Sequence, residues 1–244
     1  MNKTLLLLAI GSVGLAAQTP QASFHAGGPP EQVFDERTLQ EKYHIAPTEE
    51  GLIGALQHQL PVVRDFAAMR LAESGDKAMI RPILAALAEE NLEGSKIILA
   101  TAAAKLGAAE GFDALKNMCD DRISSPVPRM SAAQSLLLNL GRQECLSDML
   151  EVLWSPTDHH GADFMALNLL SQLKQMPPSQ LEEIRNLSTV YLKSPASELR
   201  MAASHLIRVL GGPWAVSQLQ AALDAEHEEN VRTYIAKELS SLQQ

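Results

Sequence analysis

The stretch Val63–Asp76, VRDFAAMRLAESGD, decides the fold because its pattern returns down the chain to the C-terminus. Each copy begins at a residue that is basic in most copies, such as Arg64, and small side chains follow it. An apolar residue comes seven positions after this first residue, and a glycine often comes about eleven positions after it. The frame begins six times, in steps of 32, 34, 33, 37 and 32 residues, at Arg64, Lys96, Met130, Asp163, Arg200 and Arg232. Self-similarity at such a fixed period indicates a helical repeat protein.

Each repeat is predicted to form two helices, because apolar residues recur at helical spacing in both halves. Paired alanines such as Ala67 and Ala68 let the first helix lie close to its neighbour. The first helix is expected to end at a residue that tolerates positive φ, and four repeats have a glycine there: Gly75, Gly107, Gly141 and Gly211. One helix pair cannot enclose its own apolar face, so the pairs must stack. We therefore predict an all-α fold, a right-handed α-solenoid of about six helix pairs.

The frame of Val63–Asp76, Leu199–Gly212 and Val231–Leu242 resembles the HEAT repeat, in a short form similar to that of phycobilisome-lyase-like bacterial proteins. The resemblance covers about residues 48–244. It implies an armadillo-like α-solenoid that serves as a binding scaffold, and the frame itself contains no catalytic residue.

The N-terminal part of the chain is predicted to direct export. Met1–Ala17 has one early lysine and a short apolar run before small residues, which indicates a secretory signal peptide rather than a membrane span. Residues 18–30 are expected to be a disordered spacer, 31–62 two capping helices with Thr48 as an N-cap, and 63–244 the repeat array. The mature protein is thus expected to be periplasmic or extracellular, with no transmembrane segment after signal cleavage.

The chain is acidic, with a formal net charge of −9 that becomes −10 when Lys3 leaves with the signal peptide. This charge argues against nucleic acid as a partner. Basic residues recur at or beside the start of the frame, and acidic residues lie near the preceding turns, including Glu90 and Glu226. We expect solvated salt bridges between repeats, each contributing roughly 0–1 kcal/mol. The alternative is an acidic edge that docks a basic partner.

If successive repeats are superposed, the two cysteines, Cys119 and Cys145, lie at different positions along the axes of their second helices. Eight helical residues separate these positions, which is about 12 Å. Disulfide-bonded Cα atoms lie within roughly 7 Å of one another, so both cysteines are predicted to be unpaired core residues, although export permits a bridge.

Other candidate sites are sparse. Asp158–Asp163 contains two adjacent histidines, but a zinc site needs three or four converging ligands, and helix capping explains these polar residues as well. No nucleophile elbow, His-Glu-x-x-His pair or phosphate loop is present, so we expect no catalysis, metal or cofactor. The inserted loop Gln175–Ser179 is either a spacer between two helices or part of a binding surface.

Trp154 and Tyr191 are the candidate partner-binding residues. They follow the buried stripes of adjacent second helices, and second helices usually line the concave face of HEAT-like arrays. Two such rings can form a binding patch, because Trp and Tyr are enriched among interface hot spots. The alternative is that both rings fill the core, as we expect for Trp214, because solenoid interiors absorb large side chains.

The sequence therefore predicts a non-catalytic exported scaffold that binds a protein or peptide. Two alternatives stay open: a lyase-like or chaperone-like cofactor handler, implied only by the resemblance, and a structural spacer in an envelope assembly. The sequence does not identify the partner.

Overall fold

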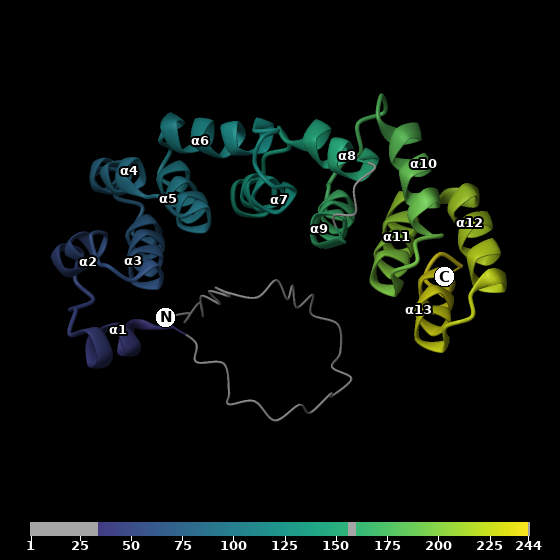
Figure 1. The fold of residues 1–244 in the computed structure, drawn as a ribbon, viewed down its shortest axis with the longest axis horizontal. Coiled ribbons are helices and arrows are strands. Elements are labelled where there is room, and N and C mark those ends of the chain that lie inside the picture. Colours follow the sequence, from purple (N-terminus) through teal and green to yellow (C-terminus); the bar gives the residue numbers. More distant parts are fainter. Residues whose placement is uncertain (1–33, 156–159, 244) are drawn as a thin grey trace. The chain divides into compact units, whose positions relative to one another are not determined.

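A computed structural model describes residues 34–155 and 160–243, and all regular structure in these ranges is helical (Figure 1). The predicted all-α class is therefore confirmed. The signal peptide and spacer expected for residues 1–30 lie outside the described residues. The helices are α1 Glu36–Tyr43, α2 Glu49–Ala55, α3 Pro61–Glu73, the 3₁₀-helix η1 Lys77–Met79, α4 Ile80–Glu89, α5 Glu93–Lys105, α6 Ala109–Asp120, α7 Pro126–Gln134, the π-helix η2 Ser135–Asn139, α8 Leu146–Trp154, α9 His160–Ser171, α10 Leu181–Tyr191, α11 Ser197–Leu210, α12 Gly212–Ala225 and α13 Glu229–Ser240.

The chain divides into two compact units, Met1–Phe112 (unit 1) and Asp113–Gln244 (unit 2). In unit 1, α3 packs against α2 and α5, and α4 packs against α5. In unit 2, the first helices α7, α9, α11 and α13 pack on one another in series, while α8, α10 and α12 pack against them as second helices. Within the described ranges, no helix has both the length and the apolar character that a membrane span requires.

The ends of several helices follow the predicted chemistry. The Thr48 hydroxyl accepts a hydrogen bond from the Gly51 N–H at 3.2 Å, which makes Thr48 the N-cap of α2. Gly75, Gly107, Gly141 and Gly211 have φ values of 72°, 94°, 68° and 68° where first helices end. This left-handed backbone region is nearly strain-free only for glycine, so these residues stop the first helices and turn the chain.

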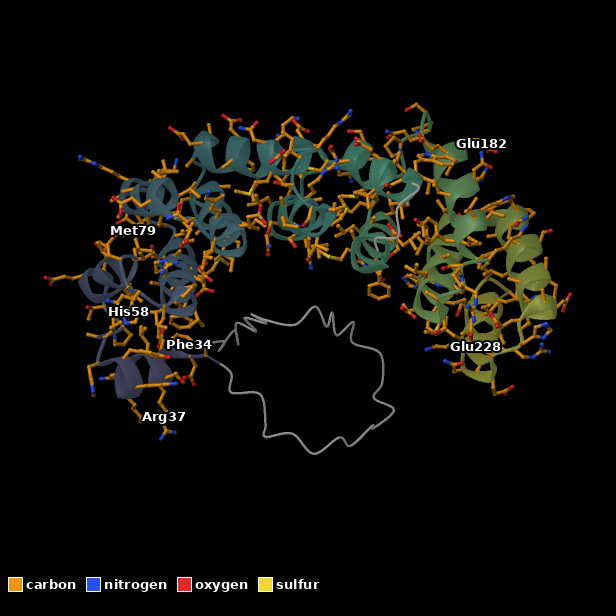
Figure 2. All side chains as sticks on the ribbon, viewed as in Figure 1. Phe34, Arg37, His58, Met79, Glu182 and Glu228 are labelled. Carbon is orange, nitrogen blue, oxygen red and sulfur yellow. A yellow bond between two sulfur atoms is a disulfide. The ribbon has the colours of Figure 1, made fainter. Side chains whose placement is uncertain are left out.

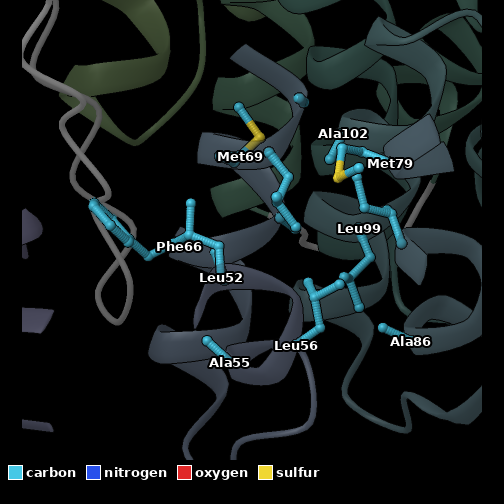
Figure 3. Packing of buried hydrophobic residues seen from close by; sticks show 14 of the residues in the cluster. Leu52, Ala55, Leu56, Phe66, Met69, Met79, Ala86, Leu99 and Ala102 are labelled. Atoms are coloured by element: carbon cyan, nitrogen blue, oxygen red, sulfur yellow. The ribbon is translucent and has the colours of Figure 1, made fainter. Parts of the chain in front are cut away.

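The core of unit 1 is built around the contact between α3 and α5 (Figure 3). Phe66, Met69 and Leu99 provide the larger buried side chains. The alanines at positions 67, 68, 102 and 103 are fully buried, and their small size lets the two helices approach. At the N-terminal end the ring of Phe34, seen in Figure 2, lies 5.1 Å from that of Phe66 and closes the cluster.

Gly111 shows how closely the second helix α6 approaches α5, the first helix of the same pair. A Cβ atom added to Gly111 would lie 2.6 Å from both the Ala100 carbonyl oxygen and the Ala104 nitrogen of α5. These are backbone atoms, so only a shift of the helices could make room.

We predict that Gly111→Ala lowers the free energy of unfolding of unit 1 by roughly 1–3 kcal/mol, because α5 and α6 must separate. Gly54→Ala is the matched control, since an added Cβ there meets nothing within 4 Å. Its better helix propensity should stabilise the protein by up to about 1 kcal/mol. Urea denaturation of both variants provides the comparison, and equal effects would contradict the close approach.

Asp65 is a carboxylic acid buried between α3 and α5. Only 2% of the residue is exposed, and the Ser95 hydroxyl donates to its Oδ2 at 3.2 Å. Its Oδ1 has no hydrogen-bond partner among the described residues. Burial raises the pKa of Asp65 to about 6, although the Ser95 hydrogen bond and the nearby Arg64 charge act in the opposite direction.

A raised pKa in the folded state means that folding favours protonated Asp65, so its stabilising contribution is complete below about pH 4 and disappears as pH rises through about 6. We predict that Asp65→Asn, which cannot ionise, raises the free energy of unfolding at pH 8 by on the order of 1–3 kcal/mol. At pH 4 the two proteins should unfold at nearly the same urea concentration. A difference that does not change between pH 4 and 8 would show that Asp65 does not titrate in this range.

Candidate functional site

A hollow of about 700 Å³ lies in unit 2 where the turn after α6 approaches the end of α8. It is lined by Arg122, Ile123, Ser124, Ser125, Pro126, Arg129, Glu151, Val152, Trp154 and Ser155. Two large apolar side chains on this surface are open to solvent: Ile123 is 99% exposed and Trp154 is 54% exposed. Exposed apolar groups gathered around one depression are typical of binding surfaces.

Trp154 and Tyr191 have different roles in the structure. Trp154 is the last residue of α8 and lines the hollow, and its Nε1 donates to Glu183 Oε1 at 2.7 Å. Tyr191 is half-buried and does not line the hollow; its hydroxyl donates to the Leu153 carbonyl at 3.2 Å and so connects α10 to the end of α8. The alternative that both rings fill the core is therefore wrong for Trp154. Trp214 does pack partly buried against the C-terminal core, as expected.

Glu183 belongs to the first turn of α10, beside Glu182, which Figure 2 labels and whose side chain is exposed. The hydrogen bond from Trp154 fixes the indole at its N–H edge. Because Trp154 stays more than half exposed, much of its surface remains open to a partner.

Arg129 forms the floor of the hollow. It is buried, and its Nε donates to the Cys119 carbonyl at 2.8 Å. A terminal nitrogen of the guanidinium lies 3.4 Å from Asp148 and 3.6 Å from Glu151. Burial raises the pKa of Asp148, the charge of Asp120 adds to this rise, and Arg129 partly offsets it. At the rim, Arg122 pairs with Glu151 at 3.0 Å.

Two other arginines occupy the same place in their repeats. Arg64 donates to the carbonyls of His58 and Gln59 and to Glu90. Arg200 donates to the carbonyls of Ser194 and Pro195, to Glu226 and to Glu228, which Figure 2 labels. In each case the carboxylate lies 26 residues after the arginine, at the end of the second helix of the same pair.

The expectation of solvated salt bridges between repeats is therefore wrong for these residues. The Arg64 and Glu90 side chains are 16% and 4% exposed, and both Arg200 and Glu226 are also largely buried. Burial alone raises the pKa of Glu90, but hydrogen bonds from backbone N–H groups and from Arg64 outweigh it, so the net pKa is lowered. The pairs join the two helices of one repeat because the arginine begins the first helix and the carboxylate follows the second.

The repeat that carries the hollow departs from the other two through its π-helix. From Arg129 to Gly141 is 12 residues (141−129), whereas Arg64 to Gly75 and Arg200 to Gly211 are 11 each. The wider turn η2 takes up the extra residue. With this residue subtracted, Glu151 corresponds to Ala85 and Ala221, and Trp154 corresponds to Ala88 and Asp224. The counterpart of Glu90 and Glu226 is Pro156, which has no carboxylate and lies outside the described residues.

Cys119 and Cys145 form a disulfide with a Cα–Cα distance of 6.0 Å, so the prediction of unpaired core cysteines is wrong. That prediction placed successive second helices side by side at equal heights. Instead, the last turn of α6 meets the N-cap of α8, so the two helices are staggered along their axes. The stagger removes the expected 12 Å offset. Because Arg129 binds the Cys119 carbonyl, the disulfide also supports the floor of the hollow.

The remaining sequence candidates contribute no described group to the hollow. Residues 156–159 lie outside the described residues, and they include Asp158 and His159 of the Asp158–Asp163 cluster. Within the described ranges, no group of three His, Cys, Asp or Glu side chains could hold a metal ion. The inserted loop Gln175–Ser179 connects α9 to α10 and does not line the hollow.

No protein family matches the chain by sequence, and no curated protein matches it either. Among solved structures, an engineered protein determined as a structural-genomics target aligns with 80% of this chain and 96% of its own, at 16% sequence identity and a TM-score of 0.47.

We predict that removing the disulfide with Cys119→Ala/Cys145→Ala lowers the free energy of unfolding by roughly 3–4 kcal/mol, because the bridge closes a 26-residue segment. Urea denaturation with and without a reductant measures the effect. The wild type should lose stability in reductant and the double variant should not. Two thiols titrating in the unfolded, unreduced wild type would contradict the bridge.

Proposed function

We propose that this chain is a non-catalytic scaffold that binds a protein or peptide through the hollow at Trp154. The observation that carries the proposal is the pair of exposed apolar side chains, Trp154 and Ile123, on one depression of about 700 Å³. Covering such side chains gains about 25 cal/mol per Å² of apolar surface, and tryptophan is the residue type most often found as an interface hot spot.

The ionisable groups of the hollow favour recognition over catalysis. Arg129 pairs with Asp148 and Glu151, and Arg122 pairs with Glu151. A general acid or base must exchange its proton with a substrate, whereas groups held in ion pairs present fixed charges to a partner. The hollow thus combines an apolar surface with a charged floor, as binding surfaces do.

We further propose that the helix pairs belong to a right-handed HEAT-type α-solenoid and that the protein is exported to the periplasm or the extracellular space. The alternation of first and second helices and the repeated arginine–glutamate pairs support the repeat architecture. The disulfide supports export, because such bridges persist mainly in oxidising compartments.

We predict that Trp154→Ala weakens binding of the natural partner by roughly tenfold or more, because it removes the exposed anchor of the hollow. The partner is first captured by crosslinking to the tagged protein in the native cell envelope. It is then purified, and its dissociation constant is measured by calorimetry with wild type and variant.

Val190→Ala is the matched control, because Val190 is 59% exposed on α10 and does not line the hollow. Its dissociation constant should stay within about twofold of the wild type, as expected for a residue outside the interface. If the two variants weaken binding equally, or neither does, the partner binds elsewhere.

A further inference from the structure

We propose that the hollow of unit 2 is a guanidinium-binding site, into which the partner inserts an arginine side chain between Glu151 and Trp154. The inference rests on the proposed binding function and adds the chemistry of the partner. It is drawn from the way in which this fold binds its own arginines.

Arg64 and Arg200 show what this place in a repeat binds. Each guanidinium donates from one terminal nitrogen to two carbonyls of the preceding turn, at 2.8 and 3.1 Å for Arg64 and at 2.9 and 3.1 Å for Arg200. Its other nitrogens donate to the glutamate at the end of the next second helix. Two sets of acceptors thus face a planar fork of N–H donors, which is the geometry that selects arginine.

The hollow retains one of these two sets of acceptors, the turn carbonyls, and has Glu151 in place of the glutamate after the second helix; its own arginine is directed to other acceptors. The turn before the arginine has the same length in all three repeats. The second helix of the preceding pair ends nine residues before the arginine, and the first helix of the arginine's own pair begins three residues before it. The equivalent carbonyls are therefore those of Ile123 and Ser124. Arg129 donates to neither of them and instead reaches the Cys119 carbonyl.

The hollow beside Arg129 is also larger than the hollows beside Arg64 and Arg200. The hollows beside Arg64 and Arg200 measure about 270 and 320 Å³, compared with about 700 Å³ beside Arg129. The larger hollow therefore has room for a side chain from outside.

The charges of the two arginines that line the hollow, Arg122 and Arg129, are already paired with Glu151 and Asp148, so the attraction for a further cation comes from the helix ends and from the exposed part of Glu151. Two helices, α6 and α8, end at the hollow, and the C-terminal end of a helix carries partial negative charge. The Glu151 side chain is 38% exposed and stands where the repeats of Arg64 and Arg200 have alanine. The exposed faces of Trp154 can stack on a guanidinium, which combines cation–π attraction with planar contact.

Two arginines oppose the binding of a further guanidinium. Arg129 is buried at the floor and paired with Asp148 and Glu151, so its charge is largely matched, whereas Arg122 lies at the rim. Arg122 holds Glu151 at 3.0 Å, yet its side chain is 75% exposed. Such a side chain can turn into solvent at little cost, so an incoming guanidinium can replace it at Glu151. Arg122 is therefore a competitor that lowers the affinity of the hollow for its ligand.

The test uses blocked five-residue peptides of glycine and serine with a central arginine, citrulline or lysine. Binding to the full chain is followed by the fluorescence of Trp154 in a Trp214→Phe background and by NMR shifts. The arginine peptide should bind with a dissociation constant on the order of 1 mM or tighter. Citrulline, which has nearly the same shape but no charge, should bind at least tenfold more weakly, and lysine should fall between them.

Two variants report on the geometry. Arg122→Ala should bind the arginine peptide several-fold more tightly than the wild type, because the competitor is gone. Glu151→Gln should bind it at least fivefold more weakly, because the carboxylate charge is gone. Thermal melting followed by circular dichroism confirms that each variant is folded, and Arg122→Ala provides a second test if Glu151→Gln does not fold.

Equal binding of arginine and citrulline, no binding of either, or weaker binding by Arg122→Ala would overturn the guanidinium assignment. If the captured natural partner still depends on Trp154 in that case, the scaffold proposal stands and only the arginine is wrong. If the peptides discriminate as expected while the partner does not depend on Trp154, the hollow binds guanidinium but the partner docks elsewhere.

Discussion

A buried or largely buried guanidinium at the start of a first helix organises three of the described helix pairs, those of Arg64, Arg129 and Arg200. Arg64 and Arg200 each connect the preceding turn, the first helix and the end of the second helix, whereas Arg129 connects the last turn of α6, the first helix α7 and the second helix α8. Because these arginines are buried, their charge has to be matched by carbonyls and carboxylates in the same place. Removing one partner of such a buried pair typically costs about 3–5 kcal/mol, so the arrangement restricts how each helix pair can close.

The helix pair α7–α8 of unit 2 also contains a buried arginine whose charge must be matched, but other residues match it. The π-helix adds one residue between Arg129 and Gly141, and the carboxylate that follows the second helix in other repeats is replaced by proline in the sequence. Asp148 and Glu151 supply the negative charge instead, and the disulfide fixes the staggered ends of α6 and α8. The repeats of Arg64 and Arg200 close without these changes, so the repeat architecture alone does not account for them.

The departures coincide with the exposed side chains. Trp154 stands where the repeats of Arg64 and Arg200 have Ala88 and Asp224, and its indole is fixed by Glu183 at the N–H edge while the residue stays more than half exposed. The hollow beside it is bounded by two helix ends and has a buried guanidinium at its floor. Apolar contact, charge and hydrogen-bond acceptors are therefore combined within one small surface, and this combination supports recognition of a specific side chain.

The helical class, the positions of the first-helix glycines and the cap at Thr48 follow from the sequence, because periodicity and backbone conformation are local properties of the chain. The choice of Trp154 as a surface residue was one of two open alternatives, since an apolar ring at the end of a helix suits either core or interface. The disulfide and the buried arginine pairs depended on tertiary structure. Superposing ideal repeats gives successive second helices equal heights, whereas the actual stagger of α6 and α8 brings Cys119 to Cys145. The extra residue before Gly141 was visible as a count of 12 instead of 11, but only the folded chain decides that a π-helix absorbs it and turns Glu151 and Trp154 toward the same hollow.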